Sequence, residues 1–373
     1  MEKDDGKRNR KMRIGILTYH RSQNYGALLQ AVALRHVLAG MGHEAWFVDY
    51  WPEYHREMYA LLSIRMIWRK VRKGHPGYAR DVVMYWRRRK ERIENFGKFI
   101  RENIEPYVKG YGDGTVFDAV VYGSDQIWRK QEEQGGAFDA VYFGKNKIVR
   151  KRDVAYAASM GTIDLGEEDE EFLKERLGKF ERITVREASL EAELKRIGLK
   201  SEVTVDPTLL MGRKEWDALL KPQGMHGERY VLYYRLLDNT FEEEEVREFA
   251  ESKGLKLVVL AGKVGKKEKD VTDTAGPEVF VALTRGAEWV VTSSYHGLVF
   301  SIIYHKPFIA SFNKNAGRAE ALLNNLGITG RLTEPRTKRE KGLPKNLPEI
   351  DYGDVDKRIE KMRRNSMEVL RGL

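Results

Sequence analysis

The sequence predicts an α/β protein whose parallel sheets are covered by helices and divided between two domains. Short apolar runs rich in β-branched residues alternate with segments of helical spacing, as in successive βαβ units. Small polar residues follow several of these runs, where the turns of a doubly covered sheet are expected. The length of 373 residues, 42% of them hydrophobic, exceeds what one core usually organises and is enough to fill two.

The first predicted βαβ unit follows a charged stretch at 1–11 that we expect to be disordered. A strand at 12–17, a polar loop at 18–25, a helix at 26–39 and a strand at 44–50 come next. The loop lets backbone approach a ligand at the start of a helix, as a phosphate-binding turn does.

A basic helical insert at 61–101 interrupts the alternation of strands and helices. It contains RKVRKGHPGYAR and YWRRRKERIENFGKFIR, with aromatic residues interleaved among the charges. The pattern fits equally well a solvated helical face with its aromatics on the core side and a surface that contacts anions or a membrane. Nucleic acid is not an expected partner, because no recognised binding motif accompanies the charges.

Several strands of the first domain run directly into polar or charged turns. The strand at 117–122 leads into GSDQ, the strand at 154–158 into SMG, and the strand at 183–185 into Arg186. Because the carboxyl ends of parallel strands meet at one edge of a sheet, we expect these turns to share a rim with the loop at 18–25.

We place the first domain at 12–210, a linker at 211–228 and the second domain at 229–350. Pro207 stiffens the turn that closes the first domain. The last segment, 351–373, is predicted to be an amphipathic helix that can pack back on the first domain.

The stretch EWVVTSSYHGLVFSIIYHKPF at 288–308 predicts a strand, a polar turn, a helix and a second strand. His296 would lie at the start of the helix, at the mouth where such sheets bind ligands. The helix dipole disfavours a charged imidazole there, so a protonated His296 needs an anion beside it, from the protein or from a ligand. The alternative is a histidine that only caps the helix or fills the core.

Composition excludes several kinds of site. The chain has no cysteine, which removes disulfides, thiolate nucleophiles and cysteine metal sites. HExxH and EF-hand spacings are missing, so we expect neither a metal nor a bound cofactor. Without an apolar run of membrane-spanning length or a signal peptide, the protein is expected in the cytoplasm. The formal net charge of +10 favours anionic partners.

Six segments, taken in order, resemble the polysaccharide pyruvyl transferase family: NYGALLQAVAL, VVYGSDQIW, YAASMG, TVREAS, VDPTLL and SSYHGLVFSIIYHKPF. The resemblance implies two Rossmann-like domains facing a cleft, as in GT-B glycosyltransferases. It also implies transfer of an enolpyruvyl unit from the co-substrate phosphoenolpyruvate to a saccharide, forming a pyruvate ketal in the synthesis of cell-surface glycans.

The resemblance implies roles for the residues on the rim. His296 would be the general acid, or a contact to phosphate. Arg186 would clamp phosphate or carboxylate, although a salt bridge with Glu187 or Asp206 explains it as well. Asp125 would be the base for an acceptor hydroxyl, or would only hold its loop as an Asx turn.

The remaining predicted contacts divide between the two substrates. Those to the donor are Ser294, Gly297, Arg235 and Arg318. Those to the acceptor are Asn24, Tyr25, Ser124 and Gln126. Asn24 can instead cap the helix that follows it, and Tyr19 and Tyr25 can either stack on a sugar or fill the core.

Two other functions stay open from the sequence. One is a GT-B-like glycosyltransferase that uses a nucleotide sugar in the same cleft. The other is a non-catalytic protein that binds anionic polymers or a membrane through the basic insert. Because the insert lies outside the family segments, the acceptor could be a lipid-linked saccharide, with the protein peripheral at the inner membrane face.

Overall fold

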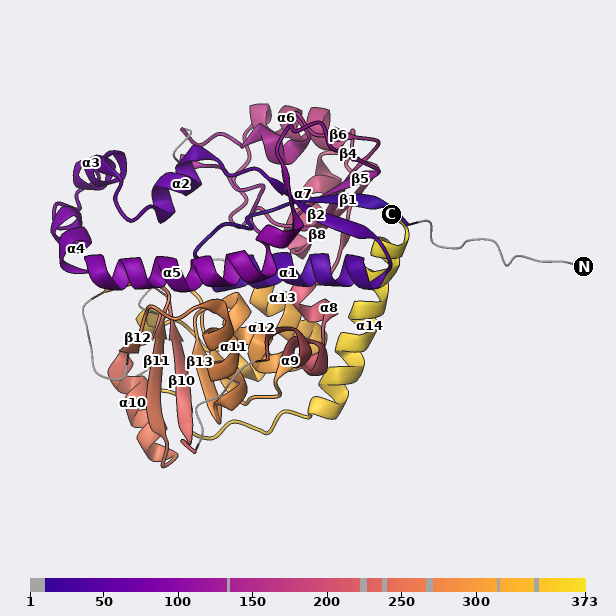
Figure 1. Ribbon diagram of the computed structural model, residues 1–373. Coiled ribbons are helices and arrows are strands. Elements are labelled where there is room, and N and C mark those ends of the chain that lie inside the picture. The colour runs from indigo at the N-terminus through magenta and orange to yellow at the C-terminus, as the bar shows by residue number, and fades with distance from the viewer. Residues whose placement is uncertain are drawn as a thin grey trace, which may run out of the picture.

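The computed structural model describes residues 11–132, 135–221, 227–236, 240–265, 271–313, 316–338 and 342–373. It consists of two α/β domains, the first above the second in Figure 1. Nearly all of the predicted lead-in, 1–10, and residues 222–226 of the predicted linker lie outside the described residues.

The first domain is built on a seven-stranded sheet in the order β3-β2-β1-β5-β7-β8-β9, in which every neighbouring pair is parallel. Its strands are β1 (Arg13–Leu17), β2 (Glu44–Asp49), β3 (Val108–Gly110), β5 (Ala119–Tyr122), β7 (Asp153–Ala158), β8 (Arg182–Val185) and β9 (Glu202–Val203). A small separate pair is formed by β4 (Val116–Phe117) and β6 (Val149–Arg150). The carboxyl ends of β1, β5, β7 and β8 therefore meet at one edge, as predicted.

Helices cover both faces of this sheet. They are α1 (Tyr25–Gly40), α6 (Glu167–Leu177), α7 (Ala188–Arg196) and α8 (Pro207–Leu210), with 3₁₀ turns η1 (Glu105–Tyr107) and η3 (Ala140–Phe143). The first three turns of α1 are buried on every side. This helix packs on the sheet with one face and on the second domain with the other, which explains its nearly uniform apolar sequence.

The basic insert forms α3 (Ile64–Arg72), α4 (Tyr78–Met84) and α5 (Trp86–Asn103), preceded by α2 (Glu53–Tyr59). Figure 1 shows α5 lying along the boundary between the domains, in line with α1. Its buried Arg92 donates hydrogen bonds to the carbonyl oxygens of Asp273 (2.7 Å) and Gly262 (2.9 Å) in the second domain. Part of the predicted solvated or membrane-facing surface is therefore an internal connection between domains.

The second domain contains a five-stranded parallel sheet in the order β12-β11-β10-β13-β14. The strands are β10 (Tyr230–Arg235), β11 (Lys256–Ala261), β12 (Val271–Thr272), β13 (Trp289–Thr292) and β14 (Phe308–Ala310). The helices are α10 (Glu243–Ser252), α11 (Pro277–Gly286), α12 (Tyr295–Ile303) and α13 (Gly317–Leu326), with 3₁₀ turns η4 (Thr329–Arg331) and η5 (Arg336–Lys338). Two parallel sheets flanked by helices confirm the predicted fold class.

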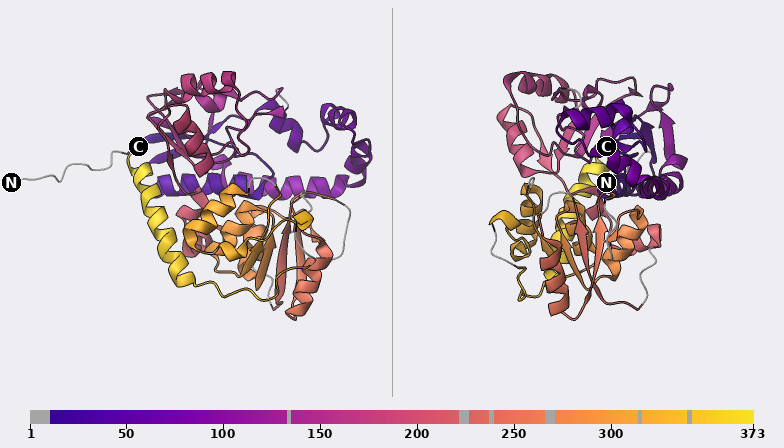
Figure 2. Two further views of the ribbon diagram at one scale, coloured as in Figure 1. Left: turned by 180° about the vertical axis from the view of Figure 1, so that it is seen from behind. Right: turned by 90° about the vertical axis from the view of Figure 1, so that its left-hand side faces the viewer.

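Two helices join the domains near the predicted linker. The linker contains α9 (Arg213–Leu220), whose fully buried Trp216 packs on Phe300 of α12 with ring centroids 5.1 Å apart. The last helix, α14 (Tyr352–Arg371), runs down one side of both domains in Figure 2. Ser366 of α14 accepts a hydrogen bond from Val205 N at 3.0 Å, so the chain returns to the first domain at its end.

One apolar cluster extends through the boundary between the domains. Tyr25 stands at its centre, with its ring 5.2 Å from those of both Phe96 and Phe280 and its hydroxyl donating to Ala275 O at 3.0 Å. Two further clusters fill the outer faces of the two sheets. The domains thus share an interior, and the polar rim of the first sheet lies against the second domain.

In the part of the chain that the structure describes, no helix is both long enough and apolar enough to cross a bilayer.

Candidate active site

His296 is the second residue of α12, and the local sequence fixes its position. Ser294 caps the helix, its hydroxyl oxygen accepting a hydrogen bond from Gly297 N at 3.3 Å. The imidazole crosses to the first domain and lies against the start of α1, where a Cβ added to Gly26 would come within 1.9 Å of Nδ1. Gly26 therefore provides the space that the ring occupies.

Asp206 is the anion beside His296, and it comes from the protein. Its Oδ2 lies 3.5 Å from His296 Nε2. Its Oδ1 accepts hydrogen bonds from Thr208 N (3.0 Å) and Thr208 Oγ1 (2.7 Å), which caps the short helix α8. Burial disfavours the charge on this carboxylate, but His296, Arg186 and Thr208 hold the pKa of Asp206 well below its usual range. A fixed negative charge therefore stands against the imidazole.

Arg186 contacts the same carboxylate oxygen, with Nη1 donating to Asp206 Oδ2 at 2.5 Å and a side chain only 1% exposed. The salt bridge that the sequence offered as an alternative is therefore formed. It engages one nitrogen alone, because no described residue accepts a hydrogen bond from Nε or Nη2. Burial opposes its charge, yet Asp206, Glu187, Tyr295 and Asp125 raise the pKa of Arg186 well above its ordinary value.

Arg318, at the start of α13, completes a pair of cations around Tyr295. The Cζ atoms of Arg186 and Arg318 lie 5.3 and 5.2 Å from the centroid of the Tyr295 ring. Burial and the nearby Arg186 lower the pKa of Arg318 below its ordinary value. Its Nε lies 3.6 Å from Glu187 Oε1 and has no hydrogen-bond acceptor among the described residues. An anion placed between the two guanidinium groups would relieve their repulsion.

The sequence analysis assigned no catalytic or binding role to several members of this cluster. Ser159 Oγ, after β7, donates a hydrogen bond to Glu187 Oε1, after β8. Asp206 joins the imidazole to the guanidinium of Arg186, and the ring of Tyr295 lies next to both arginines. A signal for three of them was present in the sequence. Ser159 directly follows a strand, Glu187 comes two residues after the next strand, and Asp206 precedes a proline as a helix cap.

The GSDQ loop lies on the same rim. Asp125 Oδ1 accepts a hydrogen bond from the adjacent Gln126 N at 2.7 Å. This is not the Asx turn considered from the sequence, in which the side chain binds the N–H two residues further on. The charge of Asp125 also acts on both Arg186 and Arg318, so it stands close to the cation pair. The side chain of Gln126 packs against Gly161, at the end of β7.

Some predicted contacts have structural roles instead. Ser124 is fully buried, with its hydroxyl and its backbone N donating to Gln30 Oε1 at 2.9 and 3.1 Å, so it holds the loop rather than offering a ligand contact. Gly297 is required for packing, since a Cβ there would lie 2.3 Å from Thr292 Oγ1.

Three more predicted contacts are engaged elsewhere. Asn24 caps α1 by accepting a hydrogen bond from Ala27 N at 3.2 Å. Tyr25 is 1% exposed inside the shared core, which leaves no face for a sugar ring. Arg235 forms an ion pair with Glu243 of α10 at 2.8 Å, because that acidic helix packs beside its strand.

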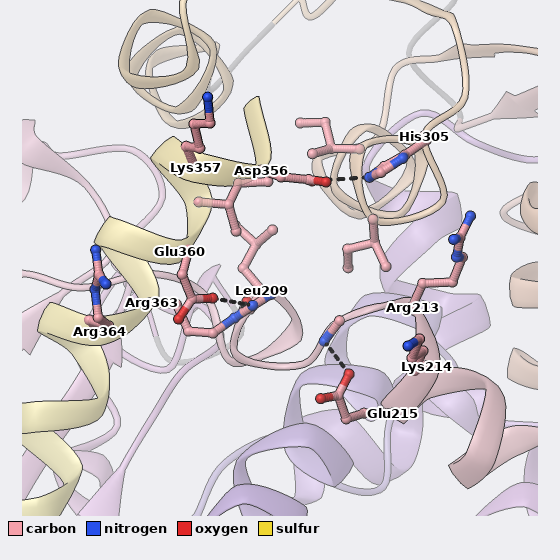
Figure 3. Close-up of a pocket in the computed structure, with 14 residues that line it drawn as sticks. Leu209, Arg213, Lys214, Glu215, His305, Asp356, Lys357, Glu360, Arg363 and Arg364 are labelled. Atoms are coloured by element: carbon pink, nitrogen blue, oxygen red, sulfur yellow. Dashed lines mark hydrogen bonds and ion pairs between the residues drawn. The ribbon is translucent and has the colours of Figure 1, made fainter. Parts of the chain in front are cut away.

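A cavity of about 620 Å³ lies at the opposite end of α12. It is lined by residues of α8, α9, α12 and α14, and none of the predicted site residues is among them. Figure 3 shows that His305 and Asp356, which both line it, point toward each other, with His305 Nε2 3.0 Å from Asp356 Oδ1. The cavity is thus separate from the cluster around His296.

Residues 24–312 match the family model described as polysaccharide pyruvyl transferase. The chain belongs to this family. No curated protein matches the chain significantly. The matched region contains His296, Asp206 and Arg186 but ends before Arg318.

The chain is similar to several solved structures at low sequence identity. A putative UDP-N-acetylglucosamine 2-epimerase from Listeria monocytogenes gives a TM-score of 0.45 and 10% identity, covering 97% of this chain and 91% of that one. The UDP-GlcNAc 2-epimerase of Methanocaldococcus jannaschii gives 0.43 and 13%, covering 94% and 93%. A glycosyltransferase from Streptomyces nogalater gives 0.39 and 12%, covering 96% of each chain.

Proposed function

We propose that this pyruvyl transferase family member uses phosphoenolpyruvate as its donor and forms a pyruvate ketal on a saccharide. The observation that carries the proposal is the buried guanidinium of Arg186, which has two nitrogens without an acceptor among the described residues. Polar groups so deeply buried are normally satisfied, and unsatisfied ones mark a strained or functional site. A carboxylate or phosphate is the ligand that such a fork recognises best.

Phosphoenolpyruvate supplies both anionic groups in one small molecule. Arg186 and Arg318 bind its phosphate or carboxylate, and the charge of the bound anion offsets the burial and the repulsion that lower the pKa of Arg318. Arg186 is buried and the side chain of Arg318 is only 13% exposed, so a donor bound between them is largely withdrawn from water.

His296 delivers the proton that the methylene carbon of the donor needs. The C3–H bond forms with the electrons of the C=C bond, and C2 gains oxocarbenium character. Asp206 stabilises the charged imidazole before transfer and orients its ring. The imidazole comes from the second domain and the arginine–aspartate pair from the first, so the site is complete only where the two domains meet.

The acceptor reacts from the side of the GSDQ loop. A first saccharide hydroxyl attacks C2 and gives its proton to Asp125, phosphate leaves with the electron pair of its C–O bond, and Asp125 passes the proton to the departing phosphate. A second hydroxyl of the same saccharide then closes the ketal at C2, and its proton restores the imidazolium of His296. The products are the cyclic ketal and inorganic phosphate.

Thermal unfolding with candidate donors tests the proposal directly. Phosphoenolpyruvate at 100 times its Kd should stabilise the protein by about 2.7 kcal/mol, whereas UDP-glucose should leave the melting temperature unchanged. Arg318→Gln should lose this stabilisation while remaining folded, because its Nε makes no hydrogen bond to the described residues. Arg229→Gln, which removes an exposed pair with Glu288 (2.8 Å) just before the start of β10, is the matched control.

Product analysis tests the reaction itself. With ¹³C-labelled phosphoenolpyruvate and a panel of hexose glycosides, we expect phosphate release together with a ketal methyl signal in NMR spectra. If UDP-glucose stabilised the protein and phosphoenolpyruvate did not, the donor would be a nucleotide sugar and the proposal would be wrong.

A further inference from the structure

The helices α3 and α4 carry apolar side chains that are left exposed. On α3, Ile64 is 79% exposed and Trp68 60%, and Val71 is exposed beside them. Their i, i+4, i+7 spacing aligns them in one stripe along the helix. On α4, Val83 is 75% exposed and Met84 is exposed next to it. These five side chains are named the α3–α4 surface.

This clustering is peculiar to one part of the molecule. Beyond residues 51–86, the exposed large apolar side chains of the described residues are four valines: Val116, Val149, Val203 and Val279. Scattered apolar residues are normal on a soluble protein, whereas a contiguous patch on projecting helices indicates an interaction site.

The orientation of α3 is held by its other faces. Arg65 donates hydrogen bonds to Glu53 (2.8 Å) and Glu57 (2.9 Å) of α2, and Arg69 pairs with the same Glu57 at 3.4 Å. Met66 is buried. These contacts hold the opposite side of the helix against the protein. The stripe of Ile64, Trp68 and Val71 therefore faces outward.

Cations border the apolar stripe. Between Leu62 and Met84 the chain has six Arg or Lys residues and a single acidic residue, Asp81. The guanidinium of Arg72 stacks over the Trp68 ring, 4.4 Å from its centroid. The bordering residues Arg72, Arg80 and Arg87 are exposed. Figures 1 and 2 show α3 and α4 projecting from the side of the first domain, where a broad partner can reach them.

We propose that the α3–α4 surface docks the protein on a bilayer that contains anionic phospholipids. Amphipathic helices with an apolar stripe, Trp and bordering cations lie in the plane of the membrane interface, and each cation near the surface attracts anionic headgroups. Ile64, Trp68 and Val83 enter the headgroup region, while Arg72 and its neighbours contact the phosphates. Nucleic acid would use the cations but leaves these apolar groups without a partner.

The α3–α4 surface lies near the GSDQ loop, where the acceptor is proposed to bind. This connection rests on the proposed function. His55 of α2, the helix before α3, packs edge-on against Tyr19 at 4.3 Å. Tyr19 in turn donates its hydroxyl to Gln126 O at 3.3 Å. The membrane contact is therefore one helix away from the GSDQ loop, an arrangement that suits a lipid-linked saccharide acceptor.

Vesicle flotation with the purified full chain tests the docking without any substrate. The protein should float with vesicles of phosphatidylcholine and phosphatidylglycerol, bind pure phosphatidylcholine more weakly, and lose affinity in high salt. Ile64→Ser combined with Trp68→Ser should weaken vesicle binding by about tenfold or more. The matched control is Val116→Ser with Val149→Ser, which removes two exposed apolar residues paired across β4 and β6 and should bind as the wild type does.

Turnover of phosphoenolpyruvate in solution separates this proposal from the proposed function, since the serine double variant of α3 should retain it. Equal vesicle binding by wild type and the α3 variant would overturn the proposal, as would failure of the wild type to float. A self-association that the α3 variant abolishes, with no vesicle binding, would instead identify the surface as an interface between copies of the chain.

Discussion

The two ends of α12 carry the same pair of residue types in contrasting surroundings. Before its start, Ser294 caps a helix whose His296 lies 3.5 Å from Asp206, and just past its end His305 lies 3.0 Å from Asp356. The first pair is buried between the domains, with side chains 12% and 0% exposed, whereas the second is 34% and 54% exposed beside an open cavity.

The difference lies in what else each carboxylate and ring contacts. Asp206 also holds the buried Arg186, whose remaining nitrogens have no acceptor among the described residues. The ring of His305 stacks on Tyr352 of α14 at 4.4 Å, so that pair fastens the last helix to the second domain. Burial and unsatisfied neighbours therefore distinguish the histidine–aspartate pair of the proposed reaction centre from the pair beside the cavity.

Replacing each histidine is the strongest way to test this contrast. His296→Ala should lower kcat for phosphate release by about 10²- to 10⁴-fold, the usual contribution of a general acid. His305→Ala should leave kcat within about twofold, because that ring contacts no part of the proposed reaction centre. Similar losses in the two variants would contradict the assignment of His296.

Replacing each aspartate should lower the free energy of unfolding by a different amount in the two pairs. Asp206→Asn leaves the buried guanidinium of Arg186 without its counter-charge, and we expect the free energy of unfolding to fall by about 3–5 kcal/mol. Asp356→Asn removes a largely exposed pair, which is worth at most about 1 kcal/mol. Urea unfolding monitored by tryptophan fluorescence measures both.

The loss of stability at low pH should also depend on Asp206. Because the folded-state pKa of Asp206 lies well below its usual value, its contribution is fully present above the unfolded-state pKa of about 3.9 and is lost as the pH falls below it. Asp206→Asn should remove this part of the acid destabilisation. Unfolding free energies of the wild type and of this variant, measured from pH 7 to pH 3, test this expectation.

The smallest effect is expected at the glycine that accommodates His296. Gly26→Ala places a methyl group where the imidazole now lies, so the ring must turn, and kcat should fall by about 10- to 100-fold while KM changes little. Gly40→Ala, in the same helix with nothing within 4 Å of the added Cβ, should keep wild-type activity. Equal activity of the two variants would mean that the position of the ring does not matter.

The local sequence pattern was sufficient to predict the strands and helices and the polar residues nearest the strand ends. Alternating apolar runs predicted the parallel strands, and the turn before His296 predicted its helix start, because both depend on neighbours a few residues away. The same reasoning failed for Tyr25 and Ser124, which look like rim residues in the chain. Their burial depends on α11 and on Gln30, which no local pattern brings together with them.

By itself the sequence determined the two parallel-sheet domains, the place of the polar turns, and the candidate imidazole and guanidinium. Only the tertiary structure decided that His296 and Arg186 meet at one oxygen of Asp206, that Arg92 ties α5 to the second domain, and that Ile64 and Trp68 stay exposed. The physical reason is that secondary structure follows from contacts within a few residues. Burial and charge pairing depend on residues far apart in the chain.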